Sequence, residues 1–183
     1  NPPFVGASMM TKLQKEEAVS IFGKGKRVNS IDYVGAWYHK AAALLENTVV
    51  KAAFVSTNSI TQGEQVAPLW EKLLNIYKVH IDFAYRTFKW NSEAKEKAAV
   101  HCVIIGFSNA YNTHPKYIYT NGVTRQEAQN INPYLVDAPD ILISSRGSAL
   151  CDVPRMTKGN QPSDGGNLIL SQKERDELLS KDA

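Results

Sequence analysis

The sequence lacks the features that would place it in a membrane or in an oxidising compartment. No stretch approaches the roughly 20 consecutive apolar residues that a membrane-spanning helix needs, and the first residues do not resemble a signal peptide. There are only 2 cysteines in 183 residues, and Cys102 and Cys151 form no CxxC pair. We therefore expect a soluble, cytoplasmic protein with no membrane partner, whose cysteines are reduced thiols.

An excess of one charge and a metal-binding pattern are also missing. The net charge is only +3, which permits a polyanionic partner without requiring one. The 4 histidines show no metal-ligand spacing with each other or with the cysteines, so we expect no metal site. No Ser/His/Asp arrangement stands out. The glycine-rich basic run at 23–27 lacks the spacing of a phosphate-binding P-loop, and we interpret it as a flexible loop.

Apolar residues are plentiful, at 43% of the chain, and their spacing predicts the secondary structure. Residues 30–45 have the periodicity of an amphipathic helix, with Ser30 as its N-terminal cap. Residues 52–55 are apolar on both faces, which favours a buried parallel strand. A polar turn follows, and residues 66–74 have the periodicity of a second helix.

Two further strands are expected at 79–86 and 99–107. The first alternates between apolar and polar residues, and the second is almost wholly apolar. The polar residues between them show no helical stripe, which indicates an antiparallel hairpin. Helix, buried strand, helix and closing hairpin are the second half of an open α/β sheet with an antiparallel edge.

The composition changes at residue 108, where asparagine, proline, glycine and isolated apolar residues become frequent. We place a domain boundary there and expect a loop-rich region beyond it. Near the C-terminus, Ser171 and Glu174 have the spacing of a capping box. They predict a charged helix whose apolar content is little more than Leu178 and Leu179, and which needs a partner surface.

The first four residues, NPPF, carry the sharpest chemical signal. Methylating the amino group of a planar base is difficult, because the nitrogen lone pair is delocalised into the ring. A catalyst must therefore hold acceptors against the amino hydrogens. The Asn1 side-chain oxygen and the Pro2 carbonyl can be those acceptors, Pro2 and Pro3 stiffen the turn, and Phe4 offers a face for a flipped base. Taken alone, the tetrapeptide is equally compatible with a turn that precedes a helix and buries the phenylalanine.

The runs that follow lower the weight of that alternative. NPPF resembles the fourth motif of the γ-class adenine-N6 DNA methyltransferases, and later runs resemble the family's fifth to eighth motifs in order. They are DYVGAWY at 32–38, AFVSTNSITQG at 53–63, and the hairpin 83–107 with RTFKW at its bend. Together with 131–135 and 159–171, they resemble the MmeI-like group of single-chain restriction-modification enzymes, in which the last two runs lead into a target-recognition domain.

This resemblance implies a fold and a set of site residues. Residues 1–107 would be the C-terminal half of a Rossmann-like class I methyltransferase sheet, and residues 108–183 a linker and partial, loop-rich recognition region. Asn1, Pro2, Pro3 and Phe4 would hold the target adenine from one side. Phe88 would press on it from the other, with Trp90 as a second candidate. The expected contacts to double-stranded DNA are Arg86, Lys89, Lys95 and Lys97, although a solvated basic loop also explains them.

The departures from the family pattern concern the cofactor. Such enzymes bind S-adenosylmethionine through a glycine-rich strand-to-helix turn and an acidic residue, both before NPPF. Neither is found here, and the nuclease part of an MmeI-like chain is also missing. We therefore expect a fragment that lacks the N-terminal half of its polypeptide. The parent would use S-adenosylmethionine, and the fragment alone would bind no cofactor and be inactive.

Two other functions remain open at this point. Asn-Pro-Pro motifs also occur in methyltransferases that act on RNA bases or on protein amides, although the runs beyond residue 108 argue against these substrates. The chain could also be a non-catalytic module that only contacts DNA.

Overall fold

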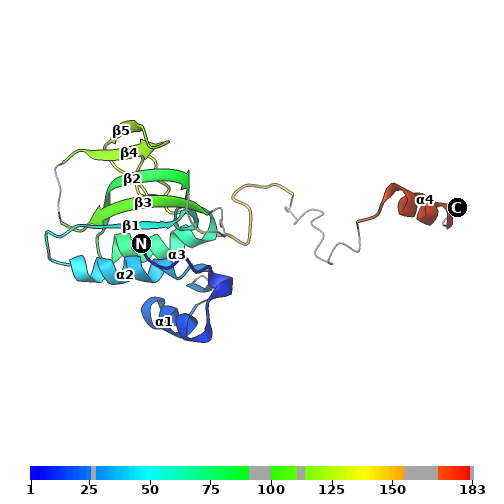
Figure 1. Cartoon of the computed structure of the whole chain (residues 1–183), viewed down its shortest axis with the longest axis horizontal. Helices are drawn as coiled ribbons and strands as arrows, with labels where there is room; N and C mark the ends of the chain where they lie inside the picture. Colours follow the sequence, from blue (N-terminus) through cyan, green and yellow to red (C-terminus); the bar gives the residue numbers. More distant parts are fainter. Residues whose placement is uncertain (26–27, 91–99, 111–113, 155–168, 182–183) are drawn as a thin grey trace. The chain divides into compact units, whose positions relative to one another are not determined.

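The computed structural model describes residues 1–25, 28–90, 100–110, 114–154 and 169–181 (Figure 1). Two compact units are present: Asn1–Ser145 and Arg146–Ala183. Among the described helices, none is both long and apolar enough to cross a membrane.

The first unit is built on a five-stranded sheet with the order β1-β3-β2-β4-β5 (Figure 1). Neighbouring strands are antiparallel, except that β4 runs parallel to β2. The pairing of β2 with β3 confirms the predicted hairpin. The strands are β1 (Ala52–Thr57), β2 (His80–Lys89), β3 (His101–Ser108), β4 (Lys116–Thr120) and β5 (Thr124–Ala128).

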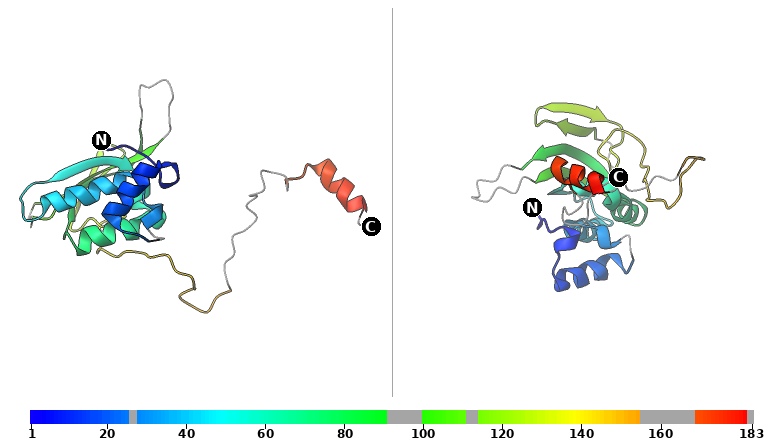
Figure 2. Two further views of the ribbon diagram at one scale, coloured as in Figure 1. Left: turned by 90° about the horizontal axis from the view of Figure 1, so that it is seen from below. Right: turned by 90° about the vertical axis from the view of Figure 1, so that its right-hand side faces the viewer.

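Three α-helices lie on one side of the sheet; the second and third pack against it, and the first lies on the outer side of these two (Figures 1 and 2). They are α1 (Lys12–Phe22), α2 (Val34–Leu45) and α3 (Val66–Asn75). Short 3-10 helices precede them in the chain: Ala7–Met9, Val28–Ser30, Asn58–Thr61 and Gly63–Gln65. Tyr38 of α2 ties the layer to the sheet, because its ring stacks on Phe107 at 5.3 Å and its hydroxyl lies 2.7 Å from Ser56 Oγ. Burial raises the pKa of Tyr38, so the phenol stays neutral.

The two predicted helices are confirmed, but the predicted cap is wrong. Ser30 lies in a 3-10 helix, and the residue that precedes α2 is Tyr33, whose side chain makes no capping hydrogen bond. The start of α2 is stabilised from the backbone instead, since Gly35 N donates to the Asp32 carbonyl. A capping box that was not anticipated opens α1, where Thr11 and Gln14 exchange hydrogen bonds.

The prediction of a parallel, doubly buried strand at 52–55 is also wrong. In the described part of the chain, β1 pairs only with β3, and the pairing is antiparallel. Its residues are mostly half-buried, and Ala53 is exposed. An apolar run is compatible with either pairing direction, because only the face toward the helices has to be buried.

The folded unit continues past residue 108, where a loop-rich region was expected. β4 and β5 were not anticipated, and they extend the sheet beside β2. The loop after them is also ordered by contacts, since Ile131 is buried and forms an isolated bridge with Ile81. The compact unit therefore ends at Ser145, whereas the change of function placed at residue 108 stays a prediction.

The second unit contains one described helix, α4 (Gln172–Lys181). The predicted capping box is confirmed: Ser171 N donates to Glu174 Oε2 at 2.8 Å, and Glu174 N donates back to Ser171 Oγ at 3.4 Å. Hydrogen bonds to the carboxylate from the Ser171 hydroxyl and then from the Ser171 backbone N–H lower the pKa of Glu174. Leu178 and Leu179 are both exposed on this helix. Both cysteines are free thiols, with Cys102 buried and Cys151 exposed.

Candidate active site

The NPPF segment alternates between reachable and packed residues. Asn1 and Pro3 are exposed, Pro2 is buried and Phe4 is half-buried. The packed Pro2 has a fixed φ and no N–H to satisfy, so it can be buried without an unpaired donor. The segment is therefore held by its second and fourth residues, while the Asn1 side chain is accessible.

Two backbone contacts dock the residues that follow NPPF. Ala7 N donates to Asp32 Oδ1 at 2.9 Å, and Tyr33 N donates to the Val5 carbonyl at 2.9 Å. The Asp32 carboxylate accepts a hydrogen bond from the N-terminal segment, and the Tyr33 N–H donates one to it. Consecutive residues, Asp32 and Tyr33, thus clamp the segment just after Phe4.

The second carboxylate oxygen of Asp32 faces the end of β1. Ser59 Oγ donates to Asp32 Oδ2 at 2.6 Å and Thr57 Oγ1 donates to it at 3.4 Å, while the two hydroxyls lie 2.8 Å apart. Asp32 N donates to Gln65 Oε1 at 2.9 Å, which fixes the backbone of the aspartate. We refer to Asp32, Thr57 and Ser59 as the Asp32 cluster.

A row of paired residues leads from the Asp32 cluster across the sheet. Thr57 of β1 pairs with Cys102 of β3, and Cys102 pairs with Phe88 of β2. Paired residues point to the same face and neighbouring strands lie about 5 Å apart, so Thr57 and Phe88 are about 10 Å apart on one face. The clamp on the NPPF segment and Phe88 therefore belong to the same end of the sheet.

A β-bulge sets the direction of Phe88. Between the pairs Tyr85–Ile104 and Phe88–Cys102, two residues of β2 lie opposite one residue of β3. Strict alternation from Tyr85 would put Phe88 on the other face, and the extra residue returns it to the face of Tyr85. Trp90 lies beside it, with 6.3 Å between the ring centroids.

The expectation that Phe88 stands at the bend of the hairpin is wrong. Phe88 lies within β2 and is half-buried. Pairing continues beyond it, because Trp90 N donates to the Val100 carbonyl at 3.0 Å. Trp90 is the more accessible of the two rings, with 36% of its surface exposed.

The basic residues expected to contact DNA fall into different classes. Arg86 is half-buried, and its Nε donates to the Leu135 carbonyl at 2.9 Å. It thus ties β2 to the loop after β5, where Leu135 has a positive φ of 57°. Lys89 is exposed at the end of β2, and Lys95 and Lys97 lie outside the described residues.

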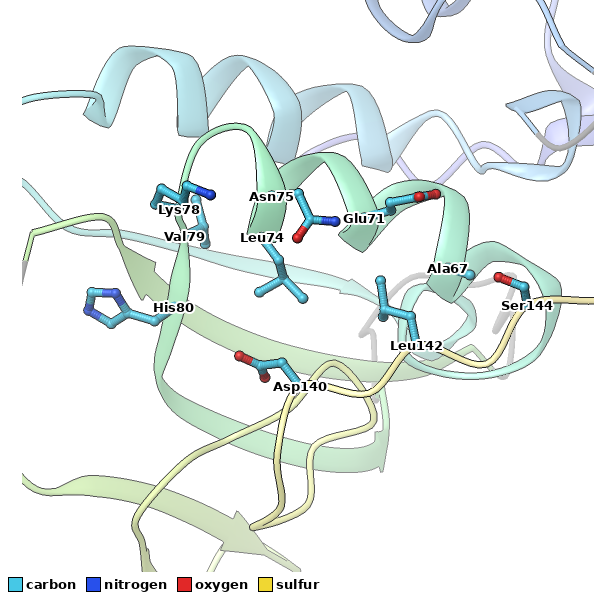
Figure 3. A pocket seen from close by; sticks show the side chains of 10 residues that line it. All are labelled: Ala67, Glu71, Leu74, Asn75, Lys78, Val79, His80, Asp140, Leu142 and Ser144. Atoms are coloured by element: carbon cyan, nitrogen blue, oxygen red, sulfur yellow. The ribbon is translucent and has the colours of Figure 1, made fainter.

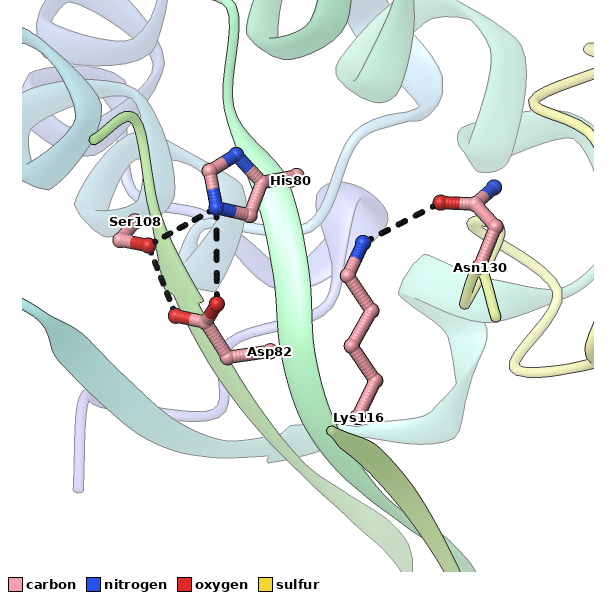
Figure 4. Close-up of polar contacts among 5 residues, drawn as sticks. All are labelled: His80, Asp82, Ser108, Lys116 and Asn130. Atoms are coloured by element: carbon pink, nitrogen blue, oxygen red, sulfur yellow. Dashed lines mark hydrogen bonds and ion pairs between the residues drawn. The ribbon is translucent and has the colours of Figure 1, made fainter. Parts of the chain in front are cut away.

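The opposite end of the hairpin carries a polar cluster that the sequence analysis missed. Ser108 Oγ lies 2.8 Å from Asp82 Oδ2 and 3.1 Å from His80 Nε2, and His80 Nε2 lies 3.5 Å from Asp82 Oδ1 (Figure 4). The residue types are those of a catalytic triad, but both oxygens face the same imidazole nitrogen. A triad needs the serine and the carboxylate on opposite nitrogens. Ser108 is also fully buried, so the cluster is structural.

A cavity of about 590 Å³ lies beside this cluster, between α3, the start of β2 and residues 140–144 (Figure 3). Its lining mixes both charges with apolar groups, including Glu71, Lys78, His80, Asp140 and Leu142. Since β2 starts there and ends near Phe88, the cavity belongs to the sheet end opposite the NPPF clamp. We therefore assign it no part in the candidate site.

The described residues do not fit a nucleotide-type cofactor. Such a site needs a glycine-rich turn between a strand and a helix, where the backbone approaches the ligand closely. After β1, the turn at 57–62 carries hydroxyl and amide side chains, and a Cβ added at Gly63 would meet nothing within 4 Å. Within the described chain, no group of three or more His, Cys, Asp or Glu residues could hold a metal.

Asp32 is the residue of this site that sequence reasoning did not single out. It opens the run DYVGAWY, but its carboxylate contacts residues 25 and 27 positions away. The available signal was an aspartate just before a helix, and its ordinary interpretation is a local cap. The hydroxyls of Thr57 and Ser59 after a strand were a second, equally general signal.

Two protein families match this chain in sequence order. Residues 1–120 match the family described as "MmeI, DNA-methyltransferase domain", and residues 137–183 match "MmeI, target recognition domain". The first match covers the NPPF segment, the Asp32 cluster and the hairpin.

A curated relative and a solved structure each match nearly the whole chain. "DNA methyltransferase A" of Bacillus subtilis (strain 168) is 42% identical over 181 residues, which are 99% of this chain and 20% of the relative. The Type IIL restriction-modification enzyme MmeI, solved in complex with DNA, is 44% identical with a TM-score of 0.88, over 99% of this chain and 25% of that one. The chain thus spans a fifth to a quarter of the length of these relatives.

Proposed function

Because the chain belongs to the MmeI family of DNA methyltransferases, we propose that it forms the target-base end of an adenine-N6 DNA methyltransferase in a restriction-modification system. The methyl donor of the whole protein would be S-adenosylmethionine, and its compartment the cytoplasm. The observation that carries the proposal is the hydrogen bond from Ala7, just after NPPF, to Asp32, whose partner Thr57 lies in one row with Phe88.

The proposed chemistry of Asn1 and Pro2 concerns the amino group of a flipped adenine. The Asn1 side-chain oxygen and the Pro2 carbonyl accept hydrogen bonds from the two amino hydrogens. These contacts favour a tetrahedral nitrogen whose lone pair is no longer delocalised into the ring, as the transition state requires. S-adenosylmethionine supplies the methyl group. Since the described residues do not fit that cofactor, the proposed role of this chain concerns the base alone.

Aromatic rings would hold the base between them. Phe4 lies two residues after Pro2, and Phe88 lies on the sheet face to which the bulge returns it. A flipped base is stabilised by stacking between such side chains. Trp90 is a second candidate for the same wall, because its ring lies beside Phe88 and is more exposed.

We propose double-stranded DNA as the substrate rather than RNA or a protein amide. The match of residues 137–183 to a target recognition domain supports DNA, because the other substrates give no reason for such a segment. Lys89, Lys95 and Lys97 are the proposed phosphate contacts. Arg86 is a weaker candidate, since one of its donors already binds the Leu135 carbonyl. We place the functional boundary at residue 108, between a catalytic half and the start of the recognition region.

Replacement of Asn1 tests the proposal. In the full-length protein, Asn1→Ala removes one preorganised acceptor, and we expect the rate of adenine methylation to fall by roughly 10²-fold or more. The measurement is single-turnover transfer of labelled methyl groups to duplex DNA, with affinity for the cofactor measured in parallel and expected to be unchanged.

Asn75→Ala is the matched control, because Asn75 is an exposed asparagine at the end of α3. It should methylate at the parent rate. If Asn1→Ala also methylates at the parent rate, Asn1 is only a turn residue and the proposed role is wrong.

A further inference from the structure

We propose that Asp32 is a positioning residue for methyl transfer, which fixes the NPPF segment relative to the wall formed by Phe88. The inference rests on the proposed function and adds a residue that contacts neither the base nor the cofactor. It is carried by the two carboxylate oxygens, which bind different parts of the fold. Asp32 Oδ1 accepts from Ala7 N, and Asp32 Oδ2 accepts from Ser59 and Thr57 at the end of β1.

Besides the packing of Pro2 and Phe4, two hydrogen bonds attach the N-terminal segment close to its functional residues. The contact to Ala7 N lies three residues after Phe4, and the bond from Tyr33 N to the Val5 carbonyl lies one residue after it. These two bonds restrain rotation and sliding of the backbone that presents Asn1 and Pro2. Without the carboxylate, the segment keeps the Val5 bond but can pivot about it.

The second carboxylate oxygen, Asp32 Oδ2, connects the N-terminal segment to the end of β1. Thr57 is paired with Cys102, and Cys102 with Phe88, so the end of β1 is rigidly connected to the proposed stacking wall. The Asp32 side chain thereby fixes the position of the two proposed acceptors of the base relative to one of its stacking rings. A displacement of about 1 Å between reacting groups can lower a rate by about 10²-fold, so this relation matters for catalysis.

The chemistry of the cluster requires a short side chain with two acceptors. The donors come from opposite sides, a backbone N–H and two hydroxyls, and the negative charge strengthens these bonds. Asparagine keeps an acceptor for Ala7 N, and its amide can donate to Ser59, because a hydroxyl both donates and accepts. Alanine removes both links. The two replacements therefore separate loss of the bridge from loss of the charge.

The test compares Asp32→Ala and Asp32→Asn in the full-length enzyme. For Asp32→Ala we expect kcat per folded molecule to fall by about 10²-fold, while KM for DNA changes by less than about threefold. Asp32→Asn should recover most of that loss. Hydrogen exchange gives a readout without catalysis: the Ala7 amide should exchange faster in Asp32→Ala and near the parent rate in Asp32→Asn.

Two further variants keep the test decisive if Asp32→Ala does not fold. The double variant Thr57→Val, Ser59→Ala cuts only the link to β1, and we expect a smaller loss of kcat in the same direction. Glu17→Ala is the control carboxylate: Glu17 accepts from the exposed Tyr33 hydroxyl, and its carboxylate has no hydrogen bond to the described residues of the N-terminal segment or of β1. It should leave kcat unchanged.

The outcomes separate this proposal from the proposed function. If the parent enzyme methylates adenine and Asn1→Ala is slow, but Asp32→Ala keeps the parent kcat per folded molecule, Asp32 is a stability residue and the inference is overturned. If Asn1→Ala has no effect either, the proposed function itself fails. A slow Asp32→Ala variant with parent-like exchange at Ala7 would also overturn the positioning role.

Discussion

The two ends of the sheet each carry a cluster of hydroxyl and carboxylate groups, and the two clusters are used differently. At one end, His80, Asp82 and Ser108 bond to one another, and Asp82 and Ser108 are buried. At the other, the half-buried Asp32 bonds outward to a segment 25 residues away. The comparison teaches that residue types alone do not make an active site. The hydrogen-bond partners of each carboxylate oxygen decide whether a cluster only stabilises the fold or also positions a reactive segment.

The largest effect that would sharpen this contrast is expected for Phe88→Ala, at the proposed catalytic end. Loss of one stacking face is worth about 1–3 kcal/mol, so base extrusion and methyl transfer should fall by roughly ten- to a hundredfold. Because Phe88 is only half-buried, the free energy of unfolding should fall by less than the ~3–5 kcal/mol of a fully buried phenylalanine. Fluorescence of 2-aminopurine at the target position measures extrusion, because unstacking brightens it.

Phe54→Ala is the aromatic control for that experiment. Phe54 packs on Tyr38 and Phe107 in the core, at 5.2 Å and 5.8 Å between ring centroids. It should lower stability without changing extrusion by the folded enzyme. The contrast breaks if Phe88→Ala melts much earlier than the parent, yet flips and methylates normally when folded in the cold. Trp90 would then be the next candidate for the wall.

A smaller effect, on stability alone, is expected at the other end. Ser108→Ala removes the hydrogen bond to the Asp82 carboxylate, and bonds to charged groups contribute about 1.5–3 kcal/mol. The free energy of unfolding in urea should fall by about that amount, while methyl transfer per folded molecule stays at the parent rate. Ser20→Ala, on the exposed face of α1, should change stability by less than about 0.5 kcal/mol. Loss of activity in Ser108→Ala at unchanged stability would show that this cluster takes part in catalysis.

The smallest effect is a pH dependence of stability that arises at His80. Desolvation lowers the pKa of His80 below its ordinary value of 6.5, with Lys116 and Lys51 acting in the same direction, while Asp82 and Asp140 raise it. The unfolded chain therefore binds the proton more readily. Stability should be full above about pH 6.5 and should decline as the pH falls through that value toward the folded-state pKa.

Thermal melting of the parent and His80→Gln between pH 8 and pH 5.5 measures this term. The variant should lose part of the slope. Burial also lowers the pKa of His39, with a contribution from Lys72, so a residual slope of the same sign should remain. An unchanged slope in His80→Gln would show that the cluster does not titrate with folding.

The sequence alone determined the features that depend on nearby residues. Helices α2 and α3 follow from apolar residues at 3.6-residue spacing, and the capping box of α4 needs only Ser171 and Glu174. The hairpin was predictable because an alternating run and an apolar run are separated by a short polar stretch with no helical stripe. Several motif-like runs in one order were also sufficient to identify the family, which the matches over 1–120 and 137–183 confirm.

Only the tertiary structure decided which distant groups meet. Strand periodicity predicts a buried face but not the neighbouring strand, so the antiparallel pairing of β1 was misjudged. A single extra residue in β2 decides the face on which Phe88 lies, and no local pattern marks it. The contacts of Arg86 with Leu135 and of Asp32 with Ala7 span 49 and 25 residues. Such contacts depend on how whole layers pack against each other, and residue spacing along the chain does not predict that packing.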